Sequence, residues 1–255
     1  MHDYHVHSNY SDGAFLFRMV AAAEEAGLQG VGIADHCMLP ASDRQRRSRG
    51  MVGFALDVTH ERRREAIQRL DDGHDIDVYD AIEMDYDPRV ESEIAEFLEE
   101  AGFDYAVGSV HSVEDTFVQW NGEFTDMDDG EREAFVDTYY ETLVDLVDSE
   151  LFAIAAHPDL VERTESIRDY STVDHYRKVA DAFADSRTVP ELNAGRALQD
   201  IEVVHPAPDF LDALRDRGVR VTLGTDAHAP EELGPRADFL REQVDDLGLE
   251  PASPF

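Results

Sequence analysis

The sequence is poor in cysteine and in long apolar runs. Its 255 residues include a single cysteine, Cys37, which excludes an internal disulfide framework. This thiol follows His36 and is either a metal ligand or a small buried residue, of which we favour the second. No apolar run approaches the ~20 residues that a membrane-spanning helix needs, and no basic-then-apolar leader precedes the first expected strand. We therefore expect a cytoplasmic protein that binds no membrane.

Positive charge is also scarce. The chain has 57 acidic and 22 basic residues, a net charge of −35, and Lys178 is its only lysine. A surface with this excess of negative charge repels itself and depends on counter-ions to stay compact. We therefore predict a halophilic protein, adapted to high salt. The same charge opposes binding to long nucleic acids, whose backbones are also negative.

Short apolar, β-branched runs alternate with longer amphipathic stretches along the whole chain. The runs, which predict strands, are residues 4–7, 30–34, 78–83, 105–110, 152–156, 188–192 and 220–224. The stretches, which predict helices, are residues 17–26, 58–70, 89–101, 132–148, 173–184, 208–217 and 237–247. This alternation indicates parallel strands joined by right-handed crossovers. Seven strands favour a closed or nearly closed barrel, and no composition break divides residues 1–255 into two domains.

Every expected strand delivers a histidine, aspartate, glutamate or asparagine at or just beyond its carboxyl end. In chain order these residues are His5, His7, Asp12, Asp35, His36, Glu83, His111, His157, Asp159, Glu191, Asn193, Asp226 and His228. The carboxyl ends of the strands form the active-site face of a parallel barrel. Six of the 11 histidines lie there. The others are interpreted as ordinary surface or core residues, although His205 could approach the site from a loop.

These side chains point to metal chemistry. His5 and His7 are two residues apart on a strand and face the same side, and nitrogen ligands beside carboxylates suit zinc, iron or manganese. The set is too large for one ion, so we expect two or three, with Glu83 as a bridging carboxylate. Ions ~3.5–4 Å apart can hold a hydroxide that attacks phosphorus. The alternative, a cluster of hydrogen-bonded core groups without metal, would be costly to bury.

The residues that carry this pattern resemble a known family. They are Tyr4-His5-Val6-His7-Ser8, Ser11-Asp12-Gly13, Ala34-Asp35-His36, Ile82-Glu83, Gly108-Ser109-Val110-His111, His157-Pro158-Asp159, Glu191-Leu192-Asn193 and Gly224-Thr225-Asp226-Ala227-His228. In this order they resemble the polymerase and histidinol phosphatase (PHP) superfamily, in its histidinol-phosphatase-like branch. The resemblance implies an α/β fold, a distorted seven-stranded (β/α)7 TIM-like barrel, with a trinuclear cluster of zinc, manganese or iron.

The resemblance also implies which residues hold each ion. His5, His7, Glu83 and Asp226 would hold the first, Glu83, His111 and His157 the second, and Asp12, His36 and His228 the third. The positions that match phosphate-binding arginines are Arg163 and Arg196, each of which could instead be a surface residue. Asp35 and Asp159 adjoin ligands and are interpreted as supporting groups or general acids. The run Arg44, Arg46, Arg47 and Arg49 is expected in a loop, which either steers substrate or acts as a lid, or is simply solvated.

The resemblance implies a metal-dependent phosphatase that acts on a small phosphorylated substrate. L-Histidinol phosphate is favoured, which would place the enzyme in histidine biosynthesis. One alternative is the same chemistry on nucleotides or short oligonucleotides. The other is a metal-binding module without hydrolytic activity, which an intact ligand set argues against.

Overall fold

The fold is a curled sheet of seven parallel strands with helices outside it. The computed structural model describes residues 1–199 and 201–255. The parallel strands are β1 (His2–Val6), β2 (Gly30–Met38), β3 (Asp77–Asp85), β4 (Tyr105–Ser109), β7 (Ile154–Ala155), β8 (Val189–Arg196) and β10 (Thr222–Gly224), paired in that order. The sheet curls until its ends meet: His7 N donates to Ala227 O at 2.9 Å, and Asp226 N donates to His5 O at 2.8 Å. The predicted distorted barrel is confirmed.

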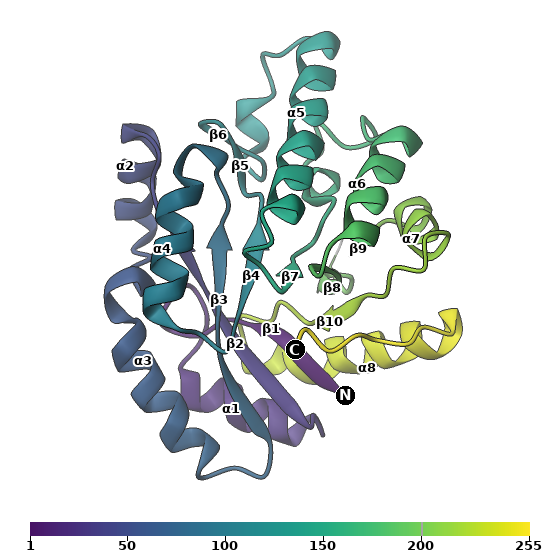
Figure 1. The fold of residues 1–255 in the computed structure, drawn as a ribbon. Coiled ribbons are helices and arrows are strands. Elements are labelled where there is room, and N and C mark those ends of the chain that lie inside the picture. Colours follow the sequence, from purple (N-terminus) through teal and green to yellow (C-terminus); the bar gives the residue numbers. More distant parts are fainter. Residues whose placement is uncertain (200) are drawn as a thin grey trace.

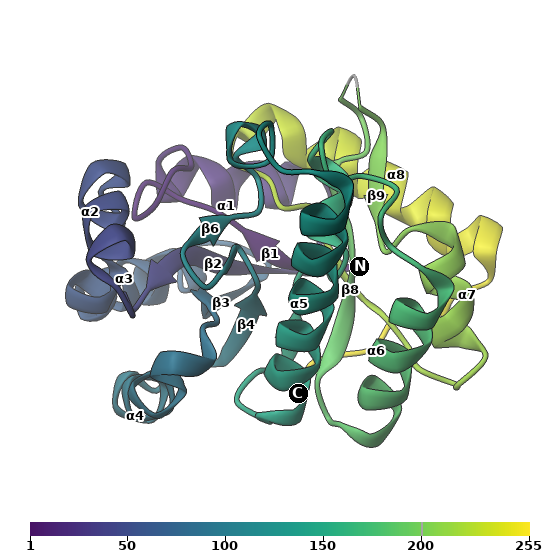
Figure 2. The ribbon, with the colours of Figure 1, turned by 90° about the horizontal axis from the view of Figure 1, so that it is seen from above.

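Helices surround this barrel. They are α1 (Leu16–Glu25), α2 (Asp43–Val52), α3 (Leu56–Asp71), α4 (Glu91–Ala101), α5 (Asp129–Asp148), α6 (Val173–Asp185), α7 (Pro208–Arg215) and α8 (Pro230–Leu247). Figure 1 labels them, and Figure 2 shows them ranged around the strands. None of the helices in the described part of the chain is long and apolar enough to cross a membrane.

Strand β3 shows how the sheet separates core from site. Its residues alternate between the two faces, as in any strand. Ile82 and Met84 point outward and pack in the large apolar core under the helices. Ala81 points inward, into a small cluster that fills the barrel. Glu83 is the next inward residue and lies near the carboxyl end of the strand. A buried charge therefore stands directly above the apolar filling of the barrel.

Strand β1 departs from strict alternation. Asp3 pairs with Val31 but Val6 pairs with Ile33, so its register with β2 shifts by one residue. Tyr4 packs inside the barrel, yet the next residue, His5, also faces inward, toward Glu83. A bulge of this kind re-aims a side chain, and such bulges are common beside active sites.

The structure corrects two predictions. The arginines at 44, 46, 47 and 49 lie on helix α2 rather than in a loop. Ser42 caps this helix by accepting from Gln45 N, and Gly53 ends it in a left-handed conformation. Helix α8 begins at Pro230, not at residue 237, because a proline is tolerated in the first turn, where its missing N–H bonds nothing. Pro235 lies within the helix.

Several short elements were not predicted. Strands β5 (Ser112–Val113) and β6 (Thr116–Phe117) form a hairpin after β4, followed by the 3-10 turn η2 (Asn121–Glu123). Strand β9 (Val203–His205) pairs antiparallel with β8. Two further 3-10 turns are η1 (Pro88–Val90) and η3 (Leu160–Arg163). Cys37 is 1% exposed in the apolar core, as the favoured interpretation predicts.

Candidate metal centre and active site

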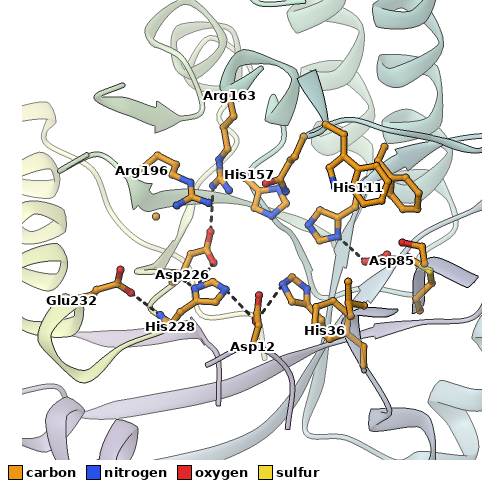
Figure 3. A pocket seen from close by; sticks show the side chains of 18 of the residues that line it. Asp12, His36, Asp85, His111, His157, Arg163, Arg196, Asp226, His228 and Glu232 are labelled. Atoms are coloured by element: carbon orange, nitrogen blue, oxygen red, sulfur yellow. Dashed lines mark hydrogen bonds and ion pairs between the residues drawn. The ribbon is translucent and has the colours of Figure 1, made fainter. Parts of the chain in front are cut away.

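The nine residues predicted as metal ligands gather at the carboxyl ends of the strands. Each has a nitrogen or oxygen within 4 Å of an atom of another. A cavity of about 390 Å³ opens beside them. Figure 3 shows Asp12, His36, His111, Asp226 and His228 pointing into it. The parallel arrangement of the strands is sufficient to bring these residues together from distant parts of the sequence.

The deepest group surrounds Glu83. His5 Nε2 lies 3.4 Å and His7 Nε2 3.6 Å from Glu83 Oε2. The two histidine nitrogens are 3.1 Å apart, and His7 Nε2 lies 3.2 Å from Asp226 Oδ1. Ligands of a tetrahedral zinc ion, at about 2.0–2.2 Å from the metal, lie roughly 3.4 Å from one another. The ligand atoms of His5, His7 and Glu83 all lie within 4.8 Å of one another, a spacing that fits a single ion. Asp226 adjoins this group through His7.

The other oxygen of Glu83 faces a second group. Glu83 Oε1 lies 3.4 Å from His111 Nε2 and 3.1 Å from His157 Nε2. Ser109 Oγ donates to the same oxygen at 2.5 Å. Glu83 is fully buried, with one oxygen toward each group. This is the orientation that a bridging carboxylate requires.

A third group centres on Asp12, in the loop after β1. Asp12 Oδ1 lies 3.3 Å from His228 Nε2 and 3.8 Å from His36 Nε2. His7 Nδ1 also approaches this oxygen, at 3.9 Å, so His7 stands between the first and third groups. His36 Nδ1 lies 2.6 Å from Glu83 Oε2, a contact that the sequence did not indicate. His36 and Glu83 are register partners in β2 and β3.

The hydrogen bonding and protonation of the buried atoms in these three groups indicate whether the side chains suit a metal. Among the described residues, His7 Nδ1, His36 Nδ1 and Glu83 Oε2 are buried and make no aligned hydrogen bond. Burial lowers the pKa of His157 to about 3, so its imidazole is neutral and offers a lone pair. Burial and the charges of His228 and His36 lower the pKa of His7 to about 4. Neutral imidazoles such as these two and unpaired carboxylate oxygens are the forms that bind divalent cations. For His5 and His36, nearby carboxylates together outweigh burial and raise the pKa, to about 10 for His36, so these imidazoles would release a proton when an ion binds.

Two carboxylates that the sequence did not single out as supports orient the histidines. Glu191 Oε1 lies 2.8 Å from His5 Nδ1, and Asp85 Oδ1 lies 2.6 Å from His111 Nδ1. Each contact fixes the nitrogen remote from Glu83, as in the carboxylate–histidine–metal arrangements of metalloproteins. Asp85 is two residues after Glu83 on β3 and so shares its face, a signal that could have identified it.

The side chain of Glu191 fits because Gly224, on the adjacent strand β10, has no side chain. A side chain at Gly224 would meet Glu191 Oε1 at 1.7 Å and the Cβ of His5 at 2.9 Å. Gly224 is the register neighbour of Asn193 on the adjacent strand. A residue larger than glycine at position 224 would therefore displace the carboxylate that orients His5.

Asp35 lies beneath the site. It accepts hydrogen bonds from Ser8 N, Ser8 Oγ and Ser11 Oγ at 2.6–2.8 Å, and from Arg63 Nη1 at 2.9 Å. Burial alone would raise the pKa of Asp35, but the charges of Arg63 and His7, together with the hydrogen bonds from Ser8 and Arg63, outweigh burial and lower it. A carboxylate held ionised in this way is a poor proton donor. Of its two predicted roles, the contacts favour support of the loop that carries Asp12.

Asp159 is also buried and hydrogen-bonded. Its Oδ1 lies 2.6 Å from His205 Nδ1, and its Oδ2 accepts from Ala207 N at 2.6 Å. On the other side of the ring, His205 Nε2 accepts from Arg163 Nε at 2.8 Å. His205 therefore approaches the site, as one of its two interpretations allowed. It does so through Arg163.

The two predicted phosphate-binding arginines both line the cavity, where Figure 3 shows them side by side. Arg163 Nη2 donates to Asn193 Oδ1 at 2.9 Å and to Asp226 Oδ2 at 3.2 Å. Arg196 donates to Gln199, and burial together with the charge of Arg163 lowers its pKa. Two guanidinium groups close together form a local positive region in a strongly acidic protein.

The four arginines of α2 are placed differently. Arg49 pairs with Asp57 at 2.6 Å, and Arg44 pairs with Glu123 in η2. Among the described residues that line the cavity, α2 contributes Ser48 and Val52, and none of the four arginines. The contacts of Arg44 and Arg49 are structural ones, which support neither a substrate-steering role nor a simply solvated one.

A parallel barrel that gathers imidazoles and carboxylates at its carboxyl end is an architecture of enzymes. The chain belongs to the PHP domain family, whose model matches residues 3–195. A Deinococcus radiodurans protein named as a probable histidinol-phosphatase is 27% identical over 235 residues, covering 89% of this chain and 85% of that protein.

Two solved structures share the fold. One, from Listeria monocytogenes and described provisionally as a histidinol phosphatase, has a TM-score of 0.78 at 15% identity, covering 92% of this chain and 97% of that chain. The other, histidinol phosphate phosphatase from Lactococcus lactis in complex with zinc, L-histidinol and phosphate, has a TM-score of 0.75 at 22% identity, covering 98% and 94%. The predicted family and fold are confirmed, and the relatives bear out the predicted class, a metal-dependent phosphatase. The substrate and the metal of this chain stay predictions.

Proposed function

We propose that this protein hydrolyses a small phosphate monoester, L-histidinol phosphate, to L-histidinol and phosphate. The observation that carries the proposal is the position of Arg163 and Arg196 in the same cavity as the cluster around Glu83. Phosphate is recognised by planar guanidinium groups. The choice of histidinol phosphate rests on the relatives' names, 27% and 22% identical to this chain.

The proposed ion-binding residues form three sets. These are His5, His7, Glu83 and Asp226; Glu83, His111 and His157; and Asp12, His36 and His228. Zinc is our first choice, because it is the ion named with the Lactococcus lactis structure and because the donors are nitrogen and oxygen. Divalent ions held there would lower the pKa of water toward neutrality and neutralise phosphoryl oxygens.

The protein's own residues bind and orient the ester. Arg163 and Arg196 would each offer N–H donors to the phosphoryl oxygens, which gain negative charge as the ester is attacked. Arg163 is held by His205 and Asn193, so little side-chain freedom remains to be lost when phosphate binds. Asp35 and Asp159, buried and hydrogen-bonded, are assigned as positioning residues.

Phosphate release from a panel of monoesters at molar salt tests the function. The panel contains L-histidinol phosphate, mononucleotides and short oligonucleotides, each with zinc, manganese or iron added. We expect the highest kcat/KM on L-histidinol phosphate. Preference for nucleotides would replace the proposed substrate, and no turnover on any ester would support a metal-binding module.

Variants test the ligand sets. His157→Ala should abolish turnover and lower the metal content measured by elemental analysis. His74→Gln, which removes a histidine paired with Glu24 away from the cavity, is the matched control and should change neither. Near-normal turnover by His157→Ala would contradict the assignment.

A further inference from the structure

The cavity has a charged side and an aromatic side. Figure 3 shows Arg163 and Arg196 across the cavity from His36 and His111. Next to His36 and His111 the lining becomes aromatic. Its rings there are those of Phe54, Phe117 and Trp120. We call these three residues the aromatic wall.

The aromatic wall is attached to the residues of the metal centre. The ring of Phe54 stacks on that of His36, with centroids 4.9 Å apart and planes 24° apart. The hairpin that carries Phe117 begins directly after His111, whose carbonyl accepts a hydrogen bond from Val118 N at 2.9 Å. The wall is therefore continuous with the side of the cavity opposite the arginines.

Trp120 is the part of the wall that is open to a ligand. Its ring lies 4.3 Å from that of Phe117, centroid to centroid. Phe117 is 7% exposed, whereas Trp120 is 45% exposed. Trp120 lines the cavity at this exposure, so part of its apolar surface is not covered by protein. Flat aromatic surface of this kind favours another ring, through offset or edge-on packing.

The two segments that form the wall are fastened to each other. Arg44 of α2 pairs with Glu123 of η2. Gln45, also on α2 and 2% exposed, donates to Ser112 Oγ at 3.3 Å and to Glu114 O at 3.1 Å. These contacts join the segment leading to Phe54 to the segment that carries Trp120. The wall is thus formed before a ligand arrives, which reduces the entropy that binding must lose.

We propose that the aromatic wall is the subsite for the leaving group, and that Trp120 is the residue through which the enzyme distinguishes an alcohol with a planar ring from one without. The inference rests on the proposed function. In-line attack from the buried cluster around Glu83 would place the leaving oxygen on the far side of the phosphorus, toward the exposed part of the cavity where Trp120 lies. The alcohol then extends toward Trp120 and Phe54. An imidazole or a nucleobase would stack on the aromatic wall, whereas an aliphatic chain would make a weaker contact and gain less binding free energy.

Trp120 provides a direct binding test, because it is the only tryptophan in the chain. The metal-loaded wild-type protein is titrated with L-histidinol, which has the ring but no phosphate, and separately with inorganic phosphate. L-Histidinol should change the tryptophan fluorescence in a saturable manner, and inorganic phosphate should change it little. Binding of L-histidinol that calorimetry detects but fluorescence does not would overturn the subsite. So would calorimetry that detects no binding of L-histidinol.

Kinetic measurements separate the contribution of the substrate's ring to binding from that of its phosphate group. Trp120→Ala should lower kcat/KM for L-histidinol phosphate about tenfold, the loss of one aromatic contact with its buried area. It should leave kcat/KM for glycerol 3-phosphate, a ringless ester, and the inhibition constant of inorganic phosphate unchanged. Trp120→Phe keeps a ring and should restore most of the activity. Phe17→Ala, which removes an aromatic residue 58% exposed on α1, is the matched control.

The outcomes distinguish the two proposals. An equal loss on both esters in Trp120→Ala would overturn the leaving-group subsite while the phosphatase function stands. A wild-type protein that turns over no ester would contradict the proposed function, and the fluorescence titration with L-histidinol would then decide the subsite alone. A preference for adenosine monophosphate that depends on Trp120 would keep the subsite and change the substrate.

Discussion

Glu191 Oε1 lies 2.8 Å from His5 Nδ1, on the side of the imidazole remote from Glu83. Its other oxygen accepts from His157 N at 3.0 Å and from Asn193 Nδ2 at 2.9 Å. One buried carboxylate thus sets the orientation of His5 and the backbone position of His157. These histidines belong to two different proposed ion sites, and both sites depend on Glu191.

Replacing Glu191 by glutamine should therefore weaken metal binding without removing a ligand. Loss of a carboxylate that orients a metal-binding histidine typically costs about 10–100-fold in affinity or activity. We expect a fall of this size in zinc affinity, measured by competition with a chromophoric chelator. Glu25→Gln, at an exposed position on α1, should behave as wild type. Unchanged affinity in Glu191→Gln would show that His5 needs no support from this residue.

The contact between His205 and Arg163 predicts an effect on substrate binding. His205→Phe removes the acceptor of Arg163 Nε, whereas His205→Gln offers a carbonyl oxygen in its place. Hydrogen bonds to charged groups contribute about 1.5–3 kcal/mol, which corresponds to roughly 10–100-fold. We expect KM for the phosphate ester to rise by about that factor in His205→Phe, with a smaller change in kcat. His205→Gln should recover part of the loss.

Metal content in His205→Phe decides how that result is interpreted. The ring nitrogens of His205 bond to Arg163 and Asp159 and to no proposed ligand, and its ring meets that of His157 only edge-on, with centroids 6.3 Å apart. Elemental analysis should therefore find the wild-type amount of metal. A variant that loses metal along with activity would place His205 among the supports of the ion sites and contradict a role through Arg163.

The sequence predicted the barrel and the ligand cluster for one physical reason. Parallel strands end at the same face, so a candidate ligand that follows each strand lies in the cluster. His157 and Asp226 could be predicted because each follows a short apolar run closely. No knowledge of the contacts between them was needed.

Other features depend on contacts that no local pattern shows. Helix α2 has no apolar stripe, since its buried residues are Gln45 and Ser48, and hydrophobic periodicity could not detect it. Only its caps, Ser42 and Gly53, were visible signals. The contact of Asp159 with His205 depends on the antiparallel pairing of β9 with β8. The register shift in β1, which turns both Tyr4 and His5 inward, is likewise a product of packing.

Ion binding should stabilise the fold. Glu83 is buried among five imidazoles. An ion that binds only the folded state, and not the unfolded chain, stabilises the folded state by mass action. At a zinc concentration 100 times Kd the gain is about 2.7 kcal/mol. We expect Tm to fall after chelation and to recover when zinc is added back. The Tm of His157→Ala should recover less when zinc is added back. An equal recovery of Tm in that variant would indicate that zinc binds elsewhere.

Salt should also stabilise the fold, through the net charge of −35. Screening shortens the range of repulsion from about 10 Å at 0.1 M to about 3 Å at 1 M salt. The free energy of unfolding, measured with urea at several potassium chloride concentrations, should therefore rise with salt. Equal stability in dilute buffer would contradict the prediction of a halophilic protein.

A charge variant separates screening from the general effect of salt on hydrophobic burial. Glu96 and Glu100 are exposed on α4, one helical turn apart. Changing both to lysine reduces the net negative charge without touching the cavity. If repulsion controls stability, the double variant is more stable than wild type in dilute buffer, and its stability rises less steeply with potassium chloride. If salt acts only by strengthening burial, the two proteins gain stability in parallel, because their apolar cores are the same.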